Sequence, residues 1–167
     1  MTTHSIISPV DGSVIAEREL ASDSLTESVL ERAHEAQTVW RNTSIAERVR
    51  LCEAMVQHLE KNAADIATEI SWQMGRPVRY TPNEILRGAQ ERARYMMSIA
   101  ESELADLAVP EVPGFTKFVR RTPVGTVLIV APWNYPYLTA INSLVPALLA
   151  GNTVVMKHAS QTLLCAE

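Results

Sequence analysis

Residues 127–136 constrain this chain more than any other segment, because an apolar run ends there in a rigid polar turn. The run at 127–130 is apolar and mostly β-branched, which predicts a strand buried on both faces, as in a parallel sheet. Pro132 and Pro136 fix the backbone on either side of Asn134 and end the strand. A polar residue just beyond the carboxyl end of such a strand lies where parallel sheets bind ligands and carry out chemistry.

The residues that follow complete a predicted βαβ unit. A helix is expected over about 137–150, with a kink at Pro146 and with Gly151 just after its last turn. Residues 153–157 predict a second buried strand, and right-handed crossovers of this kind make such strands parallel. If the two strands are adjacent, Asn134 and Lys157 line one crevice at the carboxyl edge of the sheet.

Helical patterns dominate the chain before this unit. Residues 6–16 predict a short hairpin, because a turn sequence separates two apolar stretches. Capping boxes that start at Ser24 and Ser44 each open an amphipathic helix. A third helix restarts at Asn62 and ends at Gly75.

A fourth helix and an extended segment connect these helices to the βαβ unit. The fourth helix begins at 81–84, with Glu84 as its own capping-box carboxylate, and runs to about Leu104. Prolines and a glycine make 109–114 a linker, and alternating residues at 115–121 predict an exposed or edge strand. After the second buried strand, 160–162 cap another helix, which is cut off almost at once.

Composition and charge narrow the class of protein. No apolar run approaches the roughly 18 residues that span a membrane, and the first residues lack a secretory pattern. Two cysteines form neither a disulfide framework nor a metal pair, so a reducing cytoplasm is expected. Up to Val112 the chain carries 11 Lys and Arg against 18 Asp and Glu, which argues against nucleic-acid binding. The basic later part could receive an anion such as a dinucleotide pyrophosphate, although Arg120 and Arg121 are best explained as solvated.

Three side chains near the predicted edge have a functional and a structural interpretation. The amide of Asn134 could stabilise an oxyanion, or it could bond its own backbone in the turn. Lys157 could bind ribose hydroxyls or phosphate, or it could simply reach solvent at the end of its strand. Trp133 could form a wall of a cofactor site, but a buried tryptophan is more often part of the core.

The remaining candidate groups carry no clear chemistry. The four histidines show no metal-ligand spacing, and no glycine-rich phosphate-binding motif is present. Cys52 fits an apolar helix stripe and is expected in the core. Cys165 has no positioned base, so we do not assign it as a nucleophile. No metal site is predicted.

Several motifs together resemble those of the aldehyde dehydrogenase superfamily. Residues 132–136 look like its P-W-N-[FY]-P signature, and 146–157 resemble its P-A-L-A-x-G-N-x-x-V-x-K segment. Residues 121–125 are similar to its R-x-P-x-G lead-in, 8–15 to its N-P-x-x-G-x-x-I opening, and 75–77 to its T-G-K-P. The likeness runs in order through essentially all 167 residues.

The resemblance implies NAD(P)+-dependent oxidation of an aldehyde to a carboxylic acid. In that family a Cys attacks the aldehyde, a hydride passes to the nicotinamide, and a Glu-activated water releases the acid. By this resemblance Asn134 belongs to the oxyanion hole and Lys157 binds the adenosine ribose. The other implied cofactor-site residues are Val130, Ala131, Pro132, Trp133, Ala159 and Ser160. Ser160 replaces a Glu that chelates the ribose diol, which suggests tolerance of NADP+ as well as NAD+.

The resemblance also implies a fold and its domains. We expect an α/β fold in which an N-terminal helical segment leads into a Rossmann-like parallel βαβ unit, truncated before the sheet is complete. Residues 1–114 are the N-terminal hairpin and helical part of a cofactor-binding domain. Residues 115–122 are an arm-like strand for oligomer assembly, and 123–167 are an incomplete dinucleotide-binding βαβ unit. By this resemblance the catalytic domain is expected to be absent from these residues.

Three functions are compatible with these observations. The one we favour is the N-terminal part of an aldehyde dehydrogenase, whose nucleophilic Cys and general-base Glu lie outside these residues, so that this chain alone is inactive. The second is a non-catalytic module that binds a dinucleotide or joins a homo-oligomer through the arm. The third is a truncated gene remnant. No nucleic-acid or membrane partner is expected.

Overall fold

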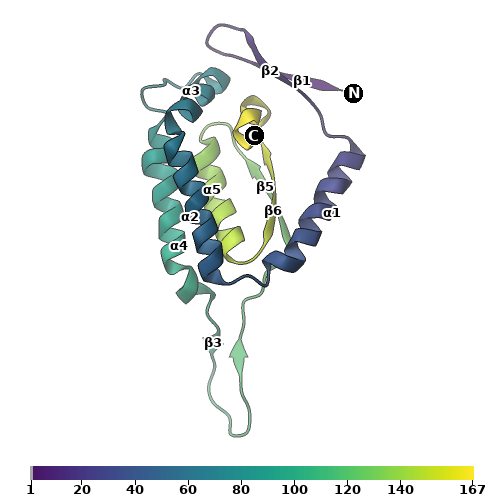
Figure 1. The fold of residues 1–167 in the computed structure, drawn as a ribbon, viewed down its shortest axis with the longest axis vertical. Coiled ribbons are helices and arrows are strands. Elements are labelled where there is room, and N and C mark those ends of the chain that lie inside the picture. Colours follow the sequence, from purple (N-terminus) through teal and green to yellow (C-terminus); the bar gives the residue numbers. More distant parts are fainter. Residues whose placement is uncertain (1) are drawn as a thin grey trace.

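The computed structural model describes residues 2–167. Figure 1 shows a body of helices beside a pair of strands, a hairpin at one end and a long arm at the other. The hairpin consists of β1 (Thr3–Ile7) and β2 (Val14–Glu19), which pair antiparallel as predicted. In the view of Figure 1, helix α1 (Asp23–Trp40) stands across the strand pair from the other long helices, and it contacts the second strand of the pair.

The predicted βαβ unit is present. Strand β5 (Thr126–Ala131) is followed by α5 (Pro136–Leu149) and then by β6 (Thr153–His158). The two strands are parallel and adjacent, with Thr126 opposite Thr153 and Ala131 opposite His158. At the end of α5, Gly151 has a φ of +84°, and its N–H bonds the Leu148 carbonyl, as expected for a residue just past a helix.

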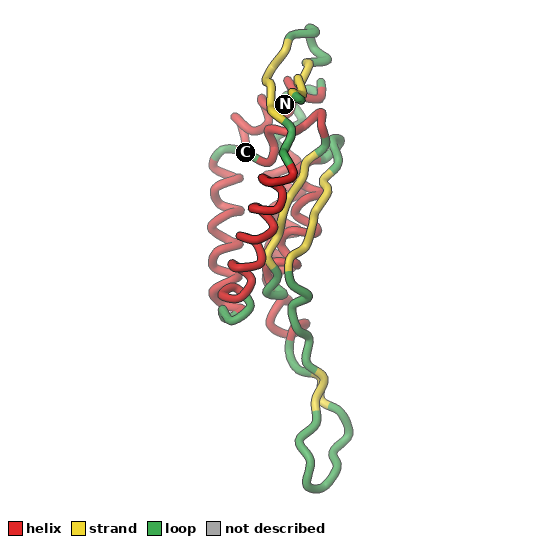
Figure 2. Tube along the Cα trace, turned by 90° about the vertical axis from the view of Figure 1, so that its right-hand side faces the viewer, coloured by secondary structure: helices red, strands yellow, loops and turns green. Residues whose placement is uncertain are grey.

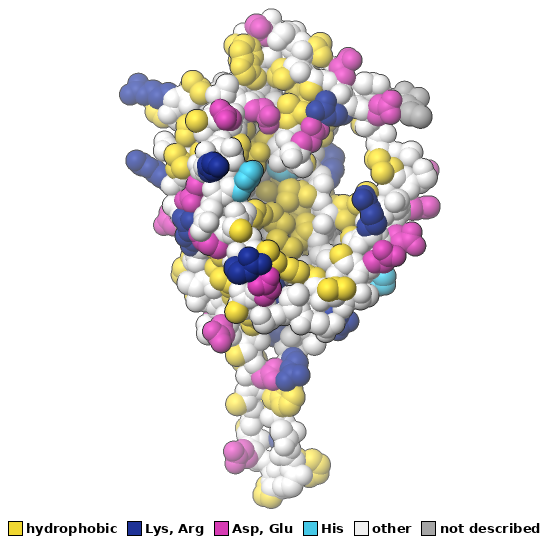
Figure 3. Space-filling model, viewed as in Figure 1, with side chains coloured by type: hydrophobic (Ala, Val, Ile, Leu, Met, Phe, Trp, Pro, Cys, Tyr) yellow, Lys and Arg dark blue, Asp and Glu magenta, His cyan; other side chains and the backbone are white. Residues whose placement is uncertain are grey.

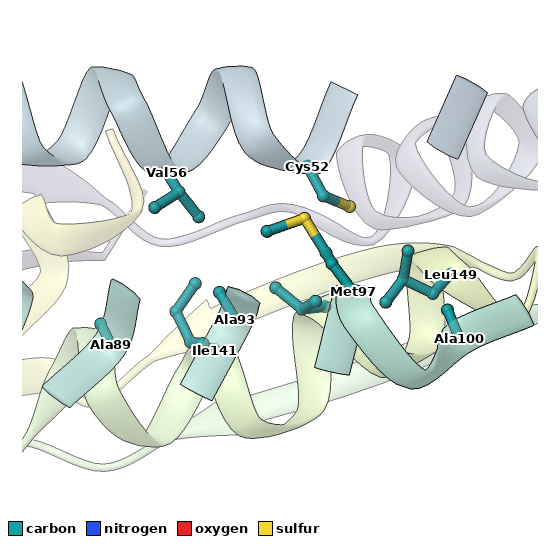
Figure 4. Close-up of a cluster of buried hydrophobic side chains, with 9 residues drawn as sticks. Cys52, Val56, Ala89, Ala93, Met97, Ala100, Ile141 and Leu149 are labelled. Atoms are coloured by element: carbon teal, nitrogen blue, oxygen red, sulfur yellow. The ribbon is translucent and has the colours of Figure 1, made fainter. Parts of the chain in front are cut away.

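A helical layer packs against α5 and forms the core. It comprises α2 (Ile45–Lys61), α3 (Ala63–Met74), a π-helical segment η1 (Glu84–Ala89) and α4 (Gln90–Leu104). Figure 4 shows side chains from three of these elements and from α5 meeting in one cluster. The buried members are Cys52, Val56, Ala89, Ala93, Met97, Ala100, Ile141, Val145 and Leu149. The alanines allow α4 to approach α5 closely, and the position of Cys52 in the core is confirmed.

The predicted edge strand at 115–121 is much shorter than expected. Within this segment β3 (Leu107–Ala108) and β4 (Phe118–Val119) pair antiparallel, and Val112 forms an isolated bridge with Phe115. In Figure 2 this segment extends well away from the body as a narrow arm. Its apolar residues lack a packed layer, and Phe115 is 72% exposed. A two-stranded ribbon such as β3–β4 is marginally stable by itself, so a longer strand here would need a surface to pack against.

Burial of β5 on both faces is wrong for this chain. Ile129 and Ala131 are buried, whereas Leu128 and Val130 are 65% and 66% exposed. Helices cover one face only, so the alternating side chains of the other face stay open. Trp133 is likewise half-exposed rather than part of the core.

Three predicted helix starts also differ from those in the structure. Ser22, not Ser24, caps α1, because its extended backbone lets its hydroxyl accept from the Leu25 N–H. By contrast, Ser44 caps α2 as predicted, by accepting from the Glu47 N–H. Glu84 does not cap its own helix, and the last segment is a short 3₁₀ helix, η2 (Ser160–Ala166), whose cap residue is Ala159.

Candidate functional site

The carboxyl edge of β5 and β6 carries the predicted site residues. In the parallel register Val130 lies opposite Lys157, so both belong to the open face of the sheet. Their side chains are exposed, and a lysine ammonium therefore stands beside an apolar surface at this edge. Because the two strands are adjacent, Asn134 follows β5 at the same edge where Lys157 lies.

The turn after β5 presents Asn134 to solvent. Pro132 is half-buried, Pro136 is buried as the first residue of α5, and the three residues between them are exposed. Among residues 2–167, no hydrogen bond engages the side-chain amide of Asn134, so it does not bond its own backbone. Its N–H groups are free to donate to a ligand at the edge.

Two residues from distant parts of the sequence support this turn. Glu84 accepts hydrogen bonds from the backbone N–H groups of Tyr137 and Leu138, at 2.8 and 3.0 Å. Arg76 forms an ion pair with Glu84 and donates to the backbone carbonyl of Asn134. The sequence patterns missed both roles, because Glu84 also fits a local capping box and Arg76 lies 58 residues before Asn134.

The amino edge of the unit is held by buried side-chain amides. Asn152 accepts from the N–H groups of Val124 and Gly125 and so fixes the entry into β5. Gln37 bonds the Gly151 carbonyl and the Thr153 N–H, and thereby joins α1 to the start of β6. These bonds set the register that brings the two carboxyl ends together.

The last two predicted cofactor residues follow β6. Ala159 is half-buried, and the Ser160 side chain is exposed at the start of η2. The Ser160 carbonyl lies 3.1 Å from Nε2 of His4, which links this segment to the hairpin.

Three titratable side chains are buried: His158 at the end of β6, Cys165 in η2 and Cys52 in the helical core. Burial lowers the pKa of His158, whose Nδ1 has no hydrogen-bond partner among the described residues. Burial also raises the pKa of Cys165 to about 12 and that of Cys52 above its usual value. Both thiols are therefore protonated at neutral pH, which makes them poor nucleophiles.

A separate open groove carries no polar chemistry. Figure 3 shows apolar side chains lining a hollow in the centre of the molecule. An open groove of about 550 Å³ lies between α1, α5 and β6, and Trp40, Leu148 and Met156 are among its lining residues. It contains none of the predicted site residues.

The part of the chain that the structure describes also holds no cluster of three or more His, Cys, Asp or Glu suited to a metal ion. No helix among these residues is long and apolar enough to cross a bilayer.

A parallel βαβ unit with a polar turn after its first strand is typical of dinucleotide-binding α/β proteins. Residues 1–167 match the model of the Aldehyde dehydrogenase family over their whole length. The chain therefore belongs to the aldehyde dehydrogenase family.

Individual relatives agree with this membership. An EPTC-inducible aldehyde dehydrogenase of Rhodococcus erythropolis is 36% identical over 137 residues, which cover 81% of this chain and 27% of that protein. Succinate-semialdehyde dehydrogenase (NADP+) 1 of Mycobacterium bovis is 33% identical over 162 residues, which cover 96% of this chain and 35% of that protein. An NAD-dependent benzaldehyde dehydrogenase from Corynebacterium glutamicum has a TM-score of 0.89 at 30% identity, covering 98% of this chain and 36% of that one. The chain thus spans roughly a third of the length of the relatives it matches.

Proposed function

We propose that this chain is the N-terminal, cofactor-side part of an NAD(P)+-dependent aldehyde dehydrogenase that oxidises an aldehyde to a carboxylic acid. The observation that carries the proposal is the exposed, unbonded amide of Asn134, held by a rigid turn at the sheet edge that also bears Lys157. Family membership supports the reaction class, and relatives named for NAD and for NADP support a nicotinamide dinucleotide as cofactor.

The residues at the edge fit such a cofactor. The dinucleotide, when bound, accepts the hydride that the aldehyde loses. Lys157 would donate to ribose hydroxyls, and the open face at Val130 would cover an apolar part of the dinucleotide. Trp133, with Pro132 and the backbone of Ala131, would form the adjoining wall. The Asn134 amide would donate to the oxygen on which negative charge develops.

Replacement of two edge side chains in the complete dehydrogenase tests this assignment. We expect N134A to lower kcat by about 10²–10³, because it removes an oxyanion donor, while the cofactor Kd changes little. K157A should instead raise the cofactor Kd. N142A, at an exposed asparagine on α5, is the matched control. An unchanged kcat in N134A would contradict the proposed role.

Ser160 bears on cofactor choice. A serine has no negative charge to repel a 2′-phosphate, so we propose that NADP+ is tolerated beside NAD+. Titration of the complete protein should give similar dissociation constants for the two cofactors, and S160E should weaken NADP+ selectively. A strong preference of the natural protein for NAD+ would contradict this hypothesis.

We propose the same domain division for the complete enzyme: a hairpin and helical part over 1–114, an arm over 115–122 and a βαβ unit over 123–167. The arm, with exposed Phe115 and Phe118, would join a homo-oligomer. The two buried, unpaired thiols fit a reducing cytoplasm. Because both cysteines are buried, we expect these 167 residues alone to oxidise no aldehyde.

A further inference from the structure

The start of α5 is capped by a residue from another helix. Tyr135 occupies the N-cap position, and its side chain makes no capping bond. Glu84 substitutes for it: one carboxylate oxygen accepts from the N–H groups of both Tyr137 and Leu138. These are the donors that a local Ser or Asp would normally satisfy. The turn that carries Asn134 is thereby tied to η1.

Arg76 makes the second connection. Its guanidinium pairs with the other carboxylate oxygen of Glu84 and donates to the backbone carbonyl of Asn134. The same group lies 4.5 Å from the centroid of the Tyr135 ring. A planar guanidinium can satisfy these contacts at once, whereas a lysine ammonium cannot stack in this way. The charged Arg76 guanidinium therefore holds the carbonyl of the peptide between Asn134 and Tyr135. Pro136 restricts the backbone on the other side of Tyr135.

The burial of this pair distinguishes it from surface ion pairs. The Glu84 side chain is fully buried and that of Arg76 is 13% exposed. Burial of an ion pair is costly, and it gives less stability than apolar packing would. A local cap at position 135 would satisfy α5 without that cost. The arrangement is thus better suited to holding one backbone geometry than to adding stability.

We propose that Arg76 and Glu84 are positioning residues that hold the Asn134 turn, so that its side-chain amide keeps a single direction toward the reacting oxygen. The catalytic part of this inference rests on the proposed function of Asn134. The structural part does not, because it concerns only the geometry of the turn. Two measurements separate the parts.

The first measurement is NMR of this 15N-labelled chain. We expect one pair of side-chain NH2 resonances for Asn134 in the natural protein. In R76M the pair should broaden or double, and the Leu138 amide should exchange faster with solvent. R79M is the matched control, because Arg79 is exposed and its guanidinium lies over the Tyr80 ring instead of this turn. If R76M does not fold, the Asn134 resonances and the Leu138 exchange are compared in R76K and E84Q instead. Unchanged Asn134 resonances in folded variants would overturn the proposal.

The second measurement is a double-mutant cycle in the complete dehydrogenase. R76M should lower kcat by about 10- to 100-fold, since small misplacements of a catalytic group are costly, with the cofactor KM within about twofold. R76K should recover part of this loss. In an N134A background R76M should have almost no further effect, because the group it positions is gone. Equal losses in both backgrounds would overturn the positioning role. If N134A itself leaves kcat unchanged, the proposed function fails, and the NMR comparison alone decides whether Arg76 holds the turn.

Discussion

At the scale of single residues, Gly151 occupies a position that no side chain can share. Its φ is +84°, and a Cβ there would lie 2.8 Å from Nη2 of Arg48. Arg48 is buried and donates to the carbonyls of Leu149 and Arg41, so it has little freedom to move. The glycine therefore meets both a backbone requirement and a packing requirement.

We expect G151A to lower the free energy of unfolding by about 2–4 kcal/mol, through left-handed strain and overpacking together. G12A is the matched control, because Gly12 has a similar φ of +78° and a Cβ at that position would meet nothing within 4 Å. It should lose only about 1 kcal/mol. Urea unfolding measures both. Equal losses would mean that Arg48 moves aside without cost.

The site residues show what local patterns can and cannot reveal. Asn134 was predicted from the two prolines around it, because they restrict the chain locally. Glu84 was assigned to its own helix, since its spacing from Thr81 is that of a capping box. In the structure it binds α5 instead. Because the Glu84 carboxylate could cap either of two helices, the one it caps is known only when both helices are placed in space.

At the scale of elements, Arg94 joins α2 to α4. Its guanidinium lies 2.8 Å from the carboxylate of Glu53 and 2.7 Å from that of Glu60. Hydrogen bonds from Arg94 hold the pKa of both carboxylates below the usual value of 4.5. A lowered pKa means that folding favours the ionised form. The stabilisation is therefore complete above the unfolded-state pKa and is lost as the pH falls through the folded-state values.

We expect R94M to lower the free energy of unfolding by about 1 kcal/mol at pH 7, as for partly exposed pairs. The difference from the natural protein should shrink below about pH 4.5 and disappear once the pH has fallen below the lowered folded-state pKa values of Glu53 and Glu60. R50M, which breaks an exposed pair within α2 alone, is the control and should cost less. Denaturant titrations across this pH range measure the effect. A difference that persists in acid would show that packing, not charge, is lost.

At the scale of the whole molecule, the arm leaves several apolar side chains exposed beyond the body. Phe115, Phe118 and Val119 are all at least 48% exposed, and only two residue pairs join β3 to β4. The Arg120–Asp106 ion pair at 2.6 Å braces the arm where the strands leave the body. So much exposed apolar area on a narrow projection is typical of an interaction surface.

We expect F115D to abolish self-association of the complete enzyme while leaving the melting temperature of this chain alone unchanged, because the Phe115 side chain is largely exposed in the monomer. V124D is the control, since Val124 is 87% exposed but lies outside the arm. Analytical ultracentrifugation measures the oligomer. A mass that is unchanged in F115D would show that the arm is not needed for assembly.

The sequence by itself determined the helices, the βαβ unit and its polar edge, because these depend on residue periodicity and on prolines and glycines acting over a few positions. The tertiary structure alone decided which strand face stays open and which side chains hold the edge. The exposure of Leu128 and the capping of α5 by Glu84 depend on elements brought together from far along the chain. Local periodicity cannot report such contacts, because burial and hydrogen bonding are completed only when distant segments pack.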